Sequence, residues 1–144
     1  MPSSTTPFTV EDWQPHAVEE AATGAGAEAT AGAGTDLALG RVAFRKTYKG
    51  DDLTGTAVAT MLNCGQLAYT AMERVTGTLG GRTGSFVLVH GAAPGGDRPD
   101  VATGVIVAGS GTGELAGLTG RMEIRHDEDG PRLFLEYDHS HNVS

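Results

Sequence analysis

The chain has 144 residues, of which 22 are glycine, roughly twice the average glycine usage. Hydrophobic residues make up 39% and charged residues 19%, which is typical of one globular domain and excludes a disordered or membrane-embedded chain. The 18 acidic and 10 basic residues give a net charge of -8, which opposes binding to nucleic acid or to an anionic membrane surface. We therefore expect neither nucleic acid nor membrane as a partner.

The amino-terminal residues carry no recognisable targeting signal. Met1 to Phe8 lack a basic flank and an apolar run, so we expect no secretory signal. The one cysteine, Cys64, cannot form an internal disulfide, and nothing points to an oxidising compartment. A cytoplasmic location is the default expectation.

The first predicted element is a short strand within residues 5–14, where Phe8, Val10 and Trp13 stand among polar neighbours. Residues 20–35 follow and consist mainly of small residues, with alanine and glycine dominant. Glycine weakens a helix, and this stretch has no apolar stripe by which a helix could pack. We predict a flexible linker at 20–35, with a cover over a binding pocket as the alternative.

Seven further strands are predicted between turns that contain glycine. β-branched and aromatic residues gather in 39–49, 53–62, 67–79, 82–90, 101–108, 121–127 and 132–138. No stretch repeats apolar residues at helical spacing over three turns. Eight consecutive strands favour an all-β fold, an eight-stranded antiparallel β-barrel, because closure removes exposed sheet edges. One domain spanning 1–144 is expected, with a short tail at 139–144.

Two adjacent glycines at 80–81 predict a two-residue hairpin loop, because both positions of such a loop favour positive φ. If residues 79 and 82 pair, Glu73 faces Leu88, and His90 lies one same-face position further along. This face is the more apolar one, so we assign it to the barrel interior. It also carries Tyr69, Ala71, Val75 and Phe86.

A second hairpin loop is predicted at Asp129-Gly130, with Glu128 paired to Pro131. In this register charged side chains share one face and apolar side chains the other, as a barrel wall requires. The inward face consists of Met122, Ile124, His126, Leu133, Leu135 and Tyr137.

Glu73 and His90 are the candidate catalytic residues. They lie diagonally across one hairpin on the apolar face, within reach of each other. Burial raises the pKa of a carboxyl group and a nearby histidine offsets this, so either protonation state suits proton transfer near neutral pH. The alternatives are a pair that only anchors a polar group of a ligand, a structural pair with all hydrogen bonds satisfied, or a slipped register that turns Glu73 to solvent.

Six residues are predicted to contact a substrate inside the barrel. If side chains alternate along the neighbouring strand, either Arg45 or Lys46 points inward. Arg45 could complete an ion pair there, with a solvated position as the alternative. The six predicted contacts are Phe44, Arg45, Tyr69, Phe86, Leu88 and Tyr137.

Other candidate chemistry is weak. His139 and His141 stand two apart in the tail but have no third ligand cluster, and Cys64 has no adjacent base. We therefore predict no metal site and no cofactor.

Two glycine-containing segments carry a family resemblance. TGTLGGRTGSFVLVHG at 76–91 and GSGTGELAGLTGRM at 109–122 resemble the bacterial domain of unknown function family 3224. Supporting motifs are KTYKGDDLTGTA at 46–57, AMER at 71–74 and FLEYD at 134–138. The resemblance implies an eight-stranded barrel similar to that of plant allene oxide cyclase, whose glycine turn resembles residues 111–120.

The resemblance also suggests a kind of function. Barrels of the allene oxide cyclase type fold a reactive hydrophobic substrate in the lumen, and bacterial spirotetronate cyclases use a similar barrel. By this resemblance we expect a cofactor-independent isomerase or cyclase acting on a lipophilic or polyketide-like natural-product intermediate. The alternative is a non-catalytic carrier of a lipophilic small molecule, and a third interpretation is an oligomerisation module whose lumen is packed and has no pocket. The threonine-rich exterior leaves both a monomer and a homodimer open.

Overall fold

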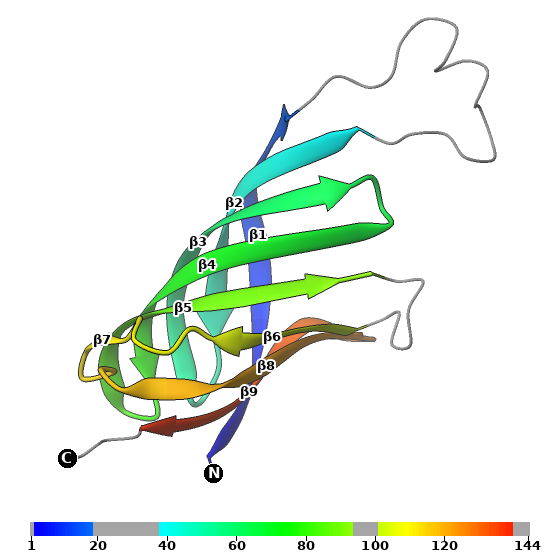
Figure 1. Cartoon of the computed structure of the whole chain (residues 1–144). Helices are drawn as coiled ribbons and strands as arrows, with labels where there is room; N and C mark the ends of the chain where they lie inside the picture. The colour runs from blue at the N-terminus through cyan, green and yellow to red at the C-terminus, as the bar shows by residue number, and fades with distance from the viewer. Residues whose placement is uncertain (1, 19–37, 94–100, 140–144) are drawn as a thin grey trace, which may run out of the picture.

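The computed structural model describes residues 2–18, 38–93 and 101–139 (Figure 1). The predicted linker at 20–35 and the tail beyond residue 139 lie outside these ranges. Within them the chain forms nine antiparallel strands and no helix, hence none long and apolar enough to cross a membrane. The strands are β1 (Ser3–Ala17), β2 (Leu39–Lys49), β3 (Leu53–Cys64), β4 (Ala68–Leu79), β5 (Arg82–Ala92), β6 (Val101–Ile106), β7 (Thr112–Gly113), β8 (Leu118–Asp127) and β9 (Gly130–His139).

Eight of these strands close into a barrel, which confirms the predicted fold class. The order is β4-β3-β2-β1-β9-β8-β6-β5, and β4 pairs with β5 to complete the ring. The ninth strand, β7, has two residues and pairs only with β5. The sequence pattern missed β7, and it placed the start of β8 three residues late, at Arg121 instead of Leu118.

The two hairpin predictions have different outcomes. Leu79 pairs with Arg82, and both loop glycines have positive φ, so the first register is confirmed. The second is wrong by two residues, because Asp127 pairs with Gly130 and the loop consists of residues 128–129. Gly130, at φ 107°, follows this loop, the place where a type I turn favours glycine. A shift of two residues preserves the faces, so the inward set of β8 and β9 stands.

A row of glycines lets the sheet bend at one end of the barrel. Gly55 pairs with Gly77, Gly77 with Gly84, and Gly84 with Gly113, across β3, β4, β5 and β7. A Cβ atom on Gly77 would lie 2.1 Å from the carbonyl oxygen of Thr54, too close for any side chain. Glycine in a strand marks such close backbone approach and tight curvature.

The barrel has one filled end and one open end. We call the end near the turn at 80–81 the closed end, where the chain from Thr112 to Leu118 folds against β5. Its lumen is filled by apolar side chains without solvent exposure. These include Tyr48, Leu53, Val75, Leu79, Phe86, Leu115, Leu118, Leu133 and Leu135.

We call the opposite end, where β3 turns into β4 at residues 64–68, the open end. There the wall is incomplete, because β1 pairs with β9 only over Ser3–Pro7. Beyond Pro7, β1 keeps only its pairing with β2, interrupted by a bulge between Glu11 and Gln14. Trp13, in this bulge, is 53% exposed and stacks at 5.3 Å on Phe44.

Candidate functional site

A buried polar cluster lies between the two ends, centred on the carboxylate of Glu73. Lys46 Nζ and His90 Nε2 each lie 2.7 Å from Glu73 Oε2. The Tyr48 hydroxyl donates a hydrogen bond to Glu73 Oε1. Glu73, Lys46 and His90 are each no more than 3% exposed. Side chains alternate between the inner and outer faces along β2, β4 and β5, and all of these residues occupy inward positions, so they meet in the lumen.

The cluster continues from His90 to Tyr69. Tyr69 Oη lies 2.8 Å from His90 Nδ1, and the two rings meet edge to face at 5.6 Å. A continuous chain of hydrogen bonds therefore runs from Tyr69 through His90 to Glu73. Glu73 is fully buried, whereas Tyr69 is half-buried, so the chain links the packed interior to the open end.

Lys46 is held by aromatic rings as well as by the carboxylate. Its ammonium lies 4.2 Å from the centre of the Phe8 ring, with Phe44 and Tyr48 slightly further away. An ammonium over an aromatic face is attracted by the ring quadrupole, more strongly when water is absent. Burial lowers the pKa of Lys46, while the charge of Glu73 and its hydrogen bond oppose that shift.

The surroundings hold Glu73 ionised. Burial alone would raise the pKa of Glu73, but the hydrogen bond from His90 and the charge of Lys46 outweigh it, and the pKa falls to about 2. Burial and the Glu73 charge raise the pKa of both Tyr48 and Tyr69 well above the ordinary value. The two phenols are therefore neutral, and the carboxylate is charged, over the physiological range.

These charges define the direction of the hydrogen bonds. An ionised carboxylate only accepts, so His90 Nε2 carries the hydrogen that points at Glu73. In the neutral ring Nδ1 then accepts from the Tyr69 hydroxyl, and in the cationic ring Nδ1 donates to the Tyr69 oxygen. A proton can thus pass between Tyr69 and His90 without any heavy atom moving.

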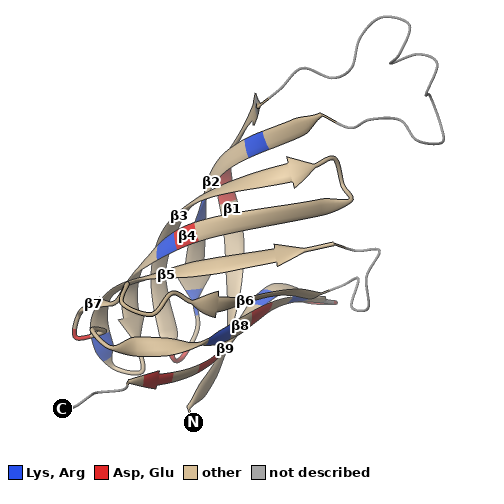
Figure 2. Ribbon diagram, viewed as in Figure 1, with Lys and Arg blue, Asp and Glu red and all other residues tan. Residues whose placement is uncertain are grey.

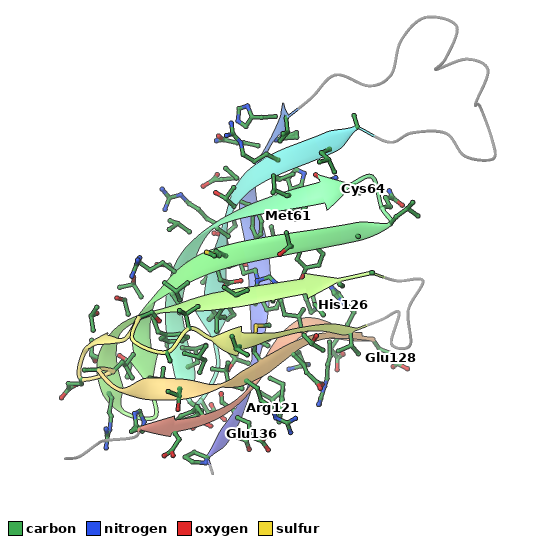
Figure 3. The ribbon with its side chains drawn as sticks, viewed as in Figure 1. Met61, Cys64, Arg121, His126, Glu128 and Glu136 are labelled. Atoms are coloured by element: carbon green, nitrogen blue, oxygen red, sulfur yellow. The ribbon has the colours of Figure 1, made fainter. Side chains whose placement is uncertain are left out.

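A cavity of about 320 Å³ occupies the open end. Tyr69 lines it and is the one cluster residue among those lining this cavity. Most of the wall is apolar, and His126 adds an imidazole; Figure 3 shows His126 at that end of β8, on the same side as Cys64. The lining comprises Met61, Asn63, Gly65, Gln66, Ala68, Tyr69, Ala92, Val101, Ala102 and His126. A concave, mainly apolar cavity with a few polar groups is the usual form of a small-molecule site.

The structure brings together the two predicted catalytic side chains. Glu73 and His90 form a direct hydrogen bond, as the hairpin register predicts, and neither lines the cavity. Their role in chemistry stays a prediction. Phe86 and Leu88, predicted to contact substrate, are fully buried in the hydrophobic core, and Tyr137 lies there as well; none of the three is among the residues that line the open-end cavity.

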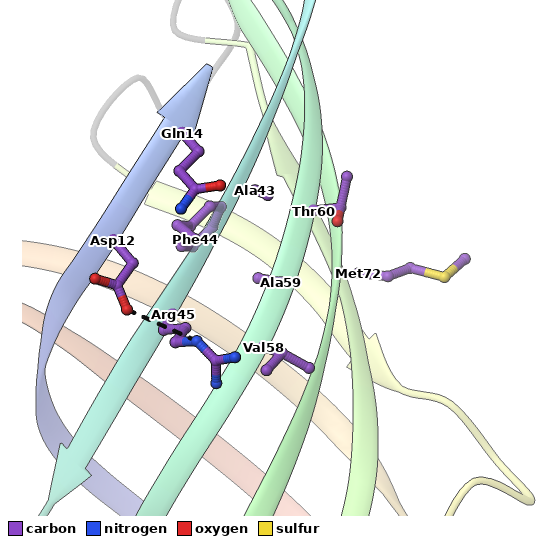
Figure 4. Close-up of a pocket in the computed structure, with 9 residues that line it drawn as sticks. All are labelled: Asp12, Gln14, Ala43, Phe44, Arg45, Val58, Ala59, Thr60 and Met72. Atoms are coloured by element: carbon purple, nitrogen blue, oxygen red, sulfur yellow. Dashed lines mark ion pairs between the residues drawn. The ribbon is translucent and has the colours of Figure 1, made fainter. Parts of the chain in front are cut away.

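Arg45 requires a correction. It does not face the lumen: its guanidinium points outward and lies 3.7 Å from Asp12, with both side chains more than half exposed (Figure 4). The inward residue is Lys46, because Phe44 and Tyr48 on either side are both buried and side chains alternate along β2. The sequence contains this signal, since two aromatic residues flank Lys46 at even spacing, but the pattern alone did not join Lys46 to Glu73. Phe44 is buried inside, as predicted, against Trp13.

No group of three or more potential metal-ligating side chains gathers within residues 2–18, 38–93 and 101–139. His139 packs against Tyr137 at the closed end, and His141 lies outside these ranges.

A family model and a solved structure both match the whole barrel, and both belong to the same protein family. The family model described as protein of unknown function (DUF3224) matches residues 4–139. A crystal structure of a protein with unknown function from the DUF3224 family of Shewanella oneidensis MR-1 is 30% identical, with a TM-score of 0.71. The similarity covers 96% of this chain and 97% of that one. No curated protein matches at a significant level.

Proposed function

The chain belongs to the DUF3224 family of proteins of unknown function, and we propose that its open-end cavity binds a lipophilic small molecule and isomerises or cyclises it by proton transfer through Tyr69 and His90. One observation carries the proposal: Tyr69 lines the cavity and also hydrogen-bonds to a histidine that is paired with a buried carboxylate. A base oriented by a carboxylate and linked to a group that meets the substrate is the arrangement of general acid–base catalysis.

The proposed step moves one proton out and back. The Tyr69 oxygen accepts a proton from an acidic C–H or O–H of the substrate while the Tyr69 proton passes to His90 Nδ1. The imidazolium is stabilised by the Glu73 carboxylate at 2.7 Å. Tyr69 then gives a proton to a different atom of the same molecule while the proton on His90 Nδ1 passes back to the Tyr69 oxygen, so the product is an isomer and both residues are regenerated. In an intramolecular ring closure the anion left by the first transfer adds to a C=C or C=O bond of the same molecule, the π bond breaks, and the atom that receives its electron pair takes the proton returned by Tyr69.

The position of Glu73 limits its role. Glu73 is buried and already accepts three hydrogen bonds, so the proposal does not require it to contact the substrate. Its carboxylate orients the His90 ring and stabilises the imidazolium form. Glu73 and Lys46 are positioning residues, and Tyr69 is the catalytic residue that meets the ligand. In this proposal Glu73, predicted as a catalytic residue, acts through His90.

A generic substrate tests the chemistry. Conversion of a β,γ-unsaturated cyclohexenone into its conjugated isomer needs only removal and return of one proton and is followed by ultraviolet absorbance. We expect the protein to accelerate it and Tyr69→Phe to lose roughly 100-fold or more of that rate. Tyr137→Phe, the same chemical change at the closed end, is the matched control and is expected to keep the rate.

A binding measurement separates catalysis from transport. Tyr69→Phe is expected to bind the lipophilic dye 1-anilinonaphthalene-8-sulfonate nearly as well as the parent chain, because the phenyl ring keeps the cavity wall. Dye binding at the cavity without any proton transfer to the enone would contradict the enzyme and favour the carrier. Failure of the dye to bind would contradict a ligand cavity of either kind.

A further inference from the structure

The outer wall of strands β3 to β6 differs from the rest of the surface in its lack of charge. In these four strands the charged residues are Glu73, Arg74 and Arg82. Glu73 points inward and Arg82 stands at the closed-end turn, so Arg74 is the one charged side chain on the outer wall of the four strands. Figure 2 shows the contrast with β8 and β9, which carry both acidic and basic positions.

This wall exposes large apolar side chains instead. Met72 is 62% exposed, Val105 49%, Val58 47% and Leu62 44%. Three of the wall positions line up across the strands, because Met72 pairs with Val89 and Val89 pairs with Val105. They form a continuous apolar stripe in place of scattered single exposures. Interface cores lack charge and contain Met more often than the remaining surface, as this wall does.

Met72 projects between two hollows in the wall. One, of about 440 Å³, reaches from Met72 over Val58 and Arg45 to the bulge in β1 (Figure 4). The other, of about 300 Å³, lies on the opposite side and is lined by Leu62, Thr70 and Val89. A knob beside a hollow on the same surface is self-complementary: a two-fold axis near Met72 places the Met72 of each copy in a hollow of the other. Methionine suits this role because its unbranched side chain adapts to the shape it meets.

From these observations we infer that the outer wall of β3 to β6, centred on Met72, is a homodimer interface for a second copy of this chain. Charge favours this face, because two chains of net charge -8 repel each other least where the surface carries almost no charge. The size also fits. Four strands about 4.8 Å apart and roughly ten residues long present on the order of 600 Å² per copy, and two copies reach the lower range of specific interfaces, about 1,200 Å² in total.

The oligomeric state of the full chain tests the inference. Light scattering after size-exclusion chromatography is expected to give twice the chain mass of 14.8 kDa. Met72→Glu places two carboxylates near the two-fold axis and is expected to raise the dimer dissociation constant by about 100-fold or more. Val105→Glu, at the other end of the stripe, is expected to act in the same direction.

Leu67→Glu is the matched control, because Leu67 is 63% exposed but lies in the turn at the open end. The control is expected to remain a dimer, and circular dichroism is expected to show all three variants folded. A monomeric parent chain, or a dimer that survives both Met72→Glu and Val105→Glu, would overturn the interface. The result does not depend on the enone assay, so each proposal can fail alone.

Discussion

The closed and open ends of the barrel are built from the same strands and the same alternation of side chains, yet only one end is filled. The closed end places Leu53, Leu79 and Phe86 inward, and these side chains leave no exposed surface. The open end places Ala92 and Ala102 at comparable inward positions and contains the 320 Å³ cavity. Small inward residues therefore add to the space at the open end, whereas large ones fill the closed end.

The polar cluster lies at the boundary between these two regions. On the side of the closed end, aromatic and aliphatic side chains enclose the cluster residues Lys46 and Glu73. On the side of the open end, the cluster residue Tyr69 lines the cavity. A buried ion pair removed from water is costly unless its hydrogen bonds are satisfied, and here each charged group has several partners. A buried ion pair of this kind adds little net stability, so we assign the cluster a role beyond packing, the proton relay proposed above.

The largest expected difference between the two ends is in stability. Phe86→Ala at the closed end is expected to lower the free energy of unfolding by about 3–5 kcal/mol, because it leaves a cavity in a fully buried core. Leu67→Ala at the open end, where the side chain is 63% exposed, is expected to change it by less than about 0.5 kcal/mol. Urea denaturation of both variants checks the comparison. Equal losses would show that the closed end is not the main source of stability.

The next effect concerns the boundary cluster and pH. The pKa of Glu73 is lowered from 4.5 to about 2 in the folded chain, which corresponds to about 3 kcal/mol of stability at neutral pH. A depressed carboxyl pKa contributes stability above the unfolded value, so this contribution is lost as the pH falls from about 4.5 to about 2. In Glu73→Gln that acid-dependent loss should disappear.

Urea unfolding at pH 7 and at about pH 3 measures the effect. Glu136→Gln is the control, because Glu136 is a carboxylate on the barrel exterior, paired with Arg121. That control is expected to keep the acid-dependent loss of the parent chain. A Glu73→Gln variant with an unchanged acid profile would contradict the assignment of the low pKa to Glu73.

The last comparison is between two neighbouring residues of β2, one of which, Arg45, is expected to have the smallest effect of all. Arg45→Ala is expected to change the free energy of unfolding by less than about 0.5 kcal/mol, because its pairing with Asp12 is long and exposed to solvent. Lys46→Ala, one residue on, is expected to cost about 3–5 kcal/mol, because it leaves Glu73 buried without its cation. Thermal and urea unfolding of the pair checks the inward and outward assignment. Similar losses for both would contradict it.

Local sequence chemistry predicted the parts that depend on neighbouring residues. The glycines at 80–81 favour one loop type, and this loop sets the pairing of β4 with β5 and thereby the contact of Glu73 with His90. The loop at 128–129 was harder to place, because an Asp-Gly pair suits more than one turn type and the true turn uses the glycine after the loop.

By itself the sequence therefore determined the eight barrel strands, the inward faces of the β4–β5 and β8–β9 hairpins and the contact of Glu73 with His90, because alternation and turn preference act between near neighbours in the chain. Only the tertiary structure decided that Lys46, 27 residues before Glu73, meets the same carboxylate, since this contact spans the intervening strand β3. The fold likewise decided which end of the lumen stays open. Curvature at the glycine row and the incomplete pairing of β1 with β9 depend on how the strands close into a barrel, and no local pattern encodes that closure.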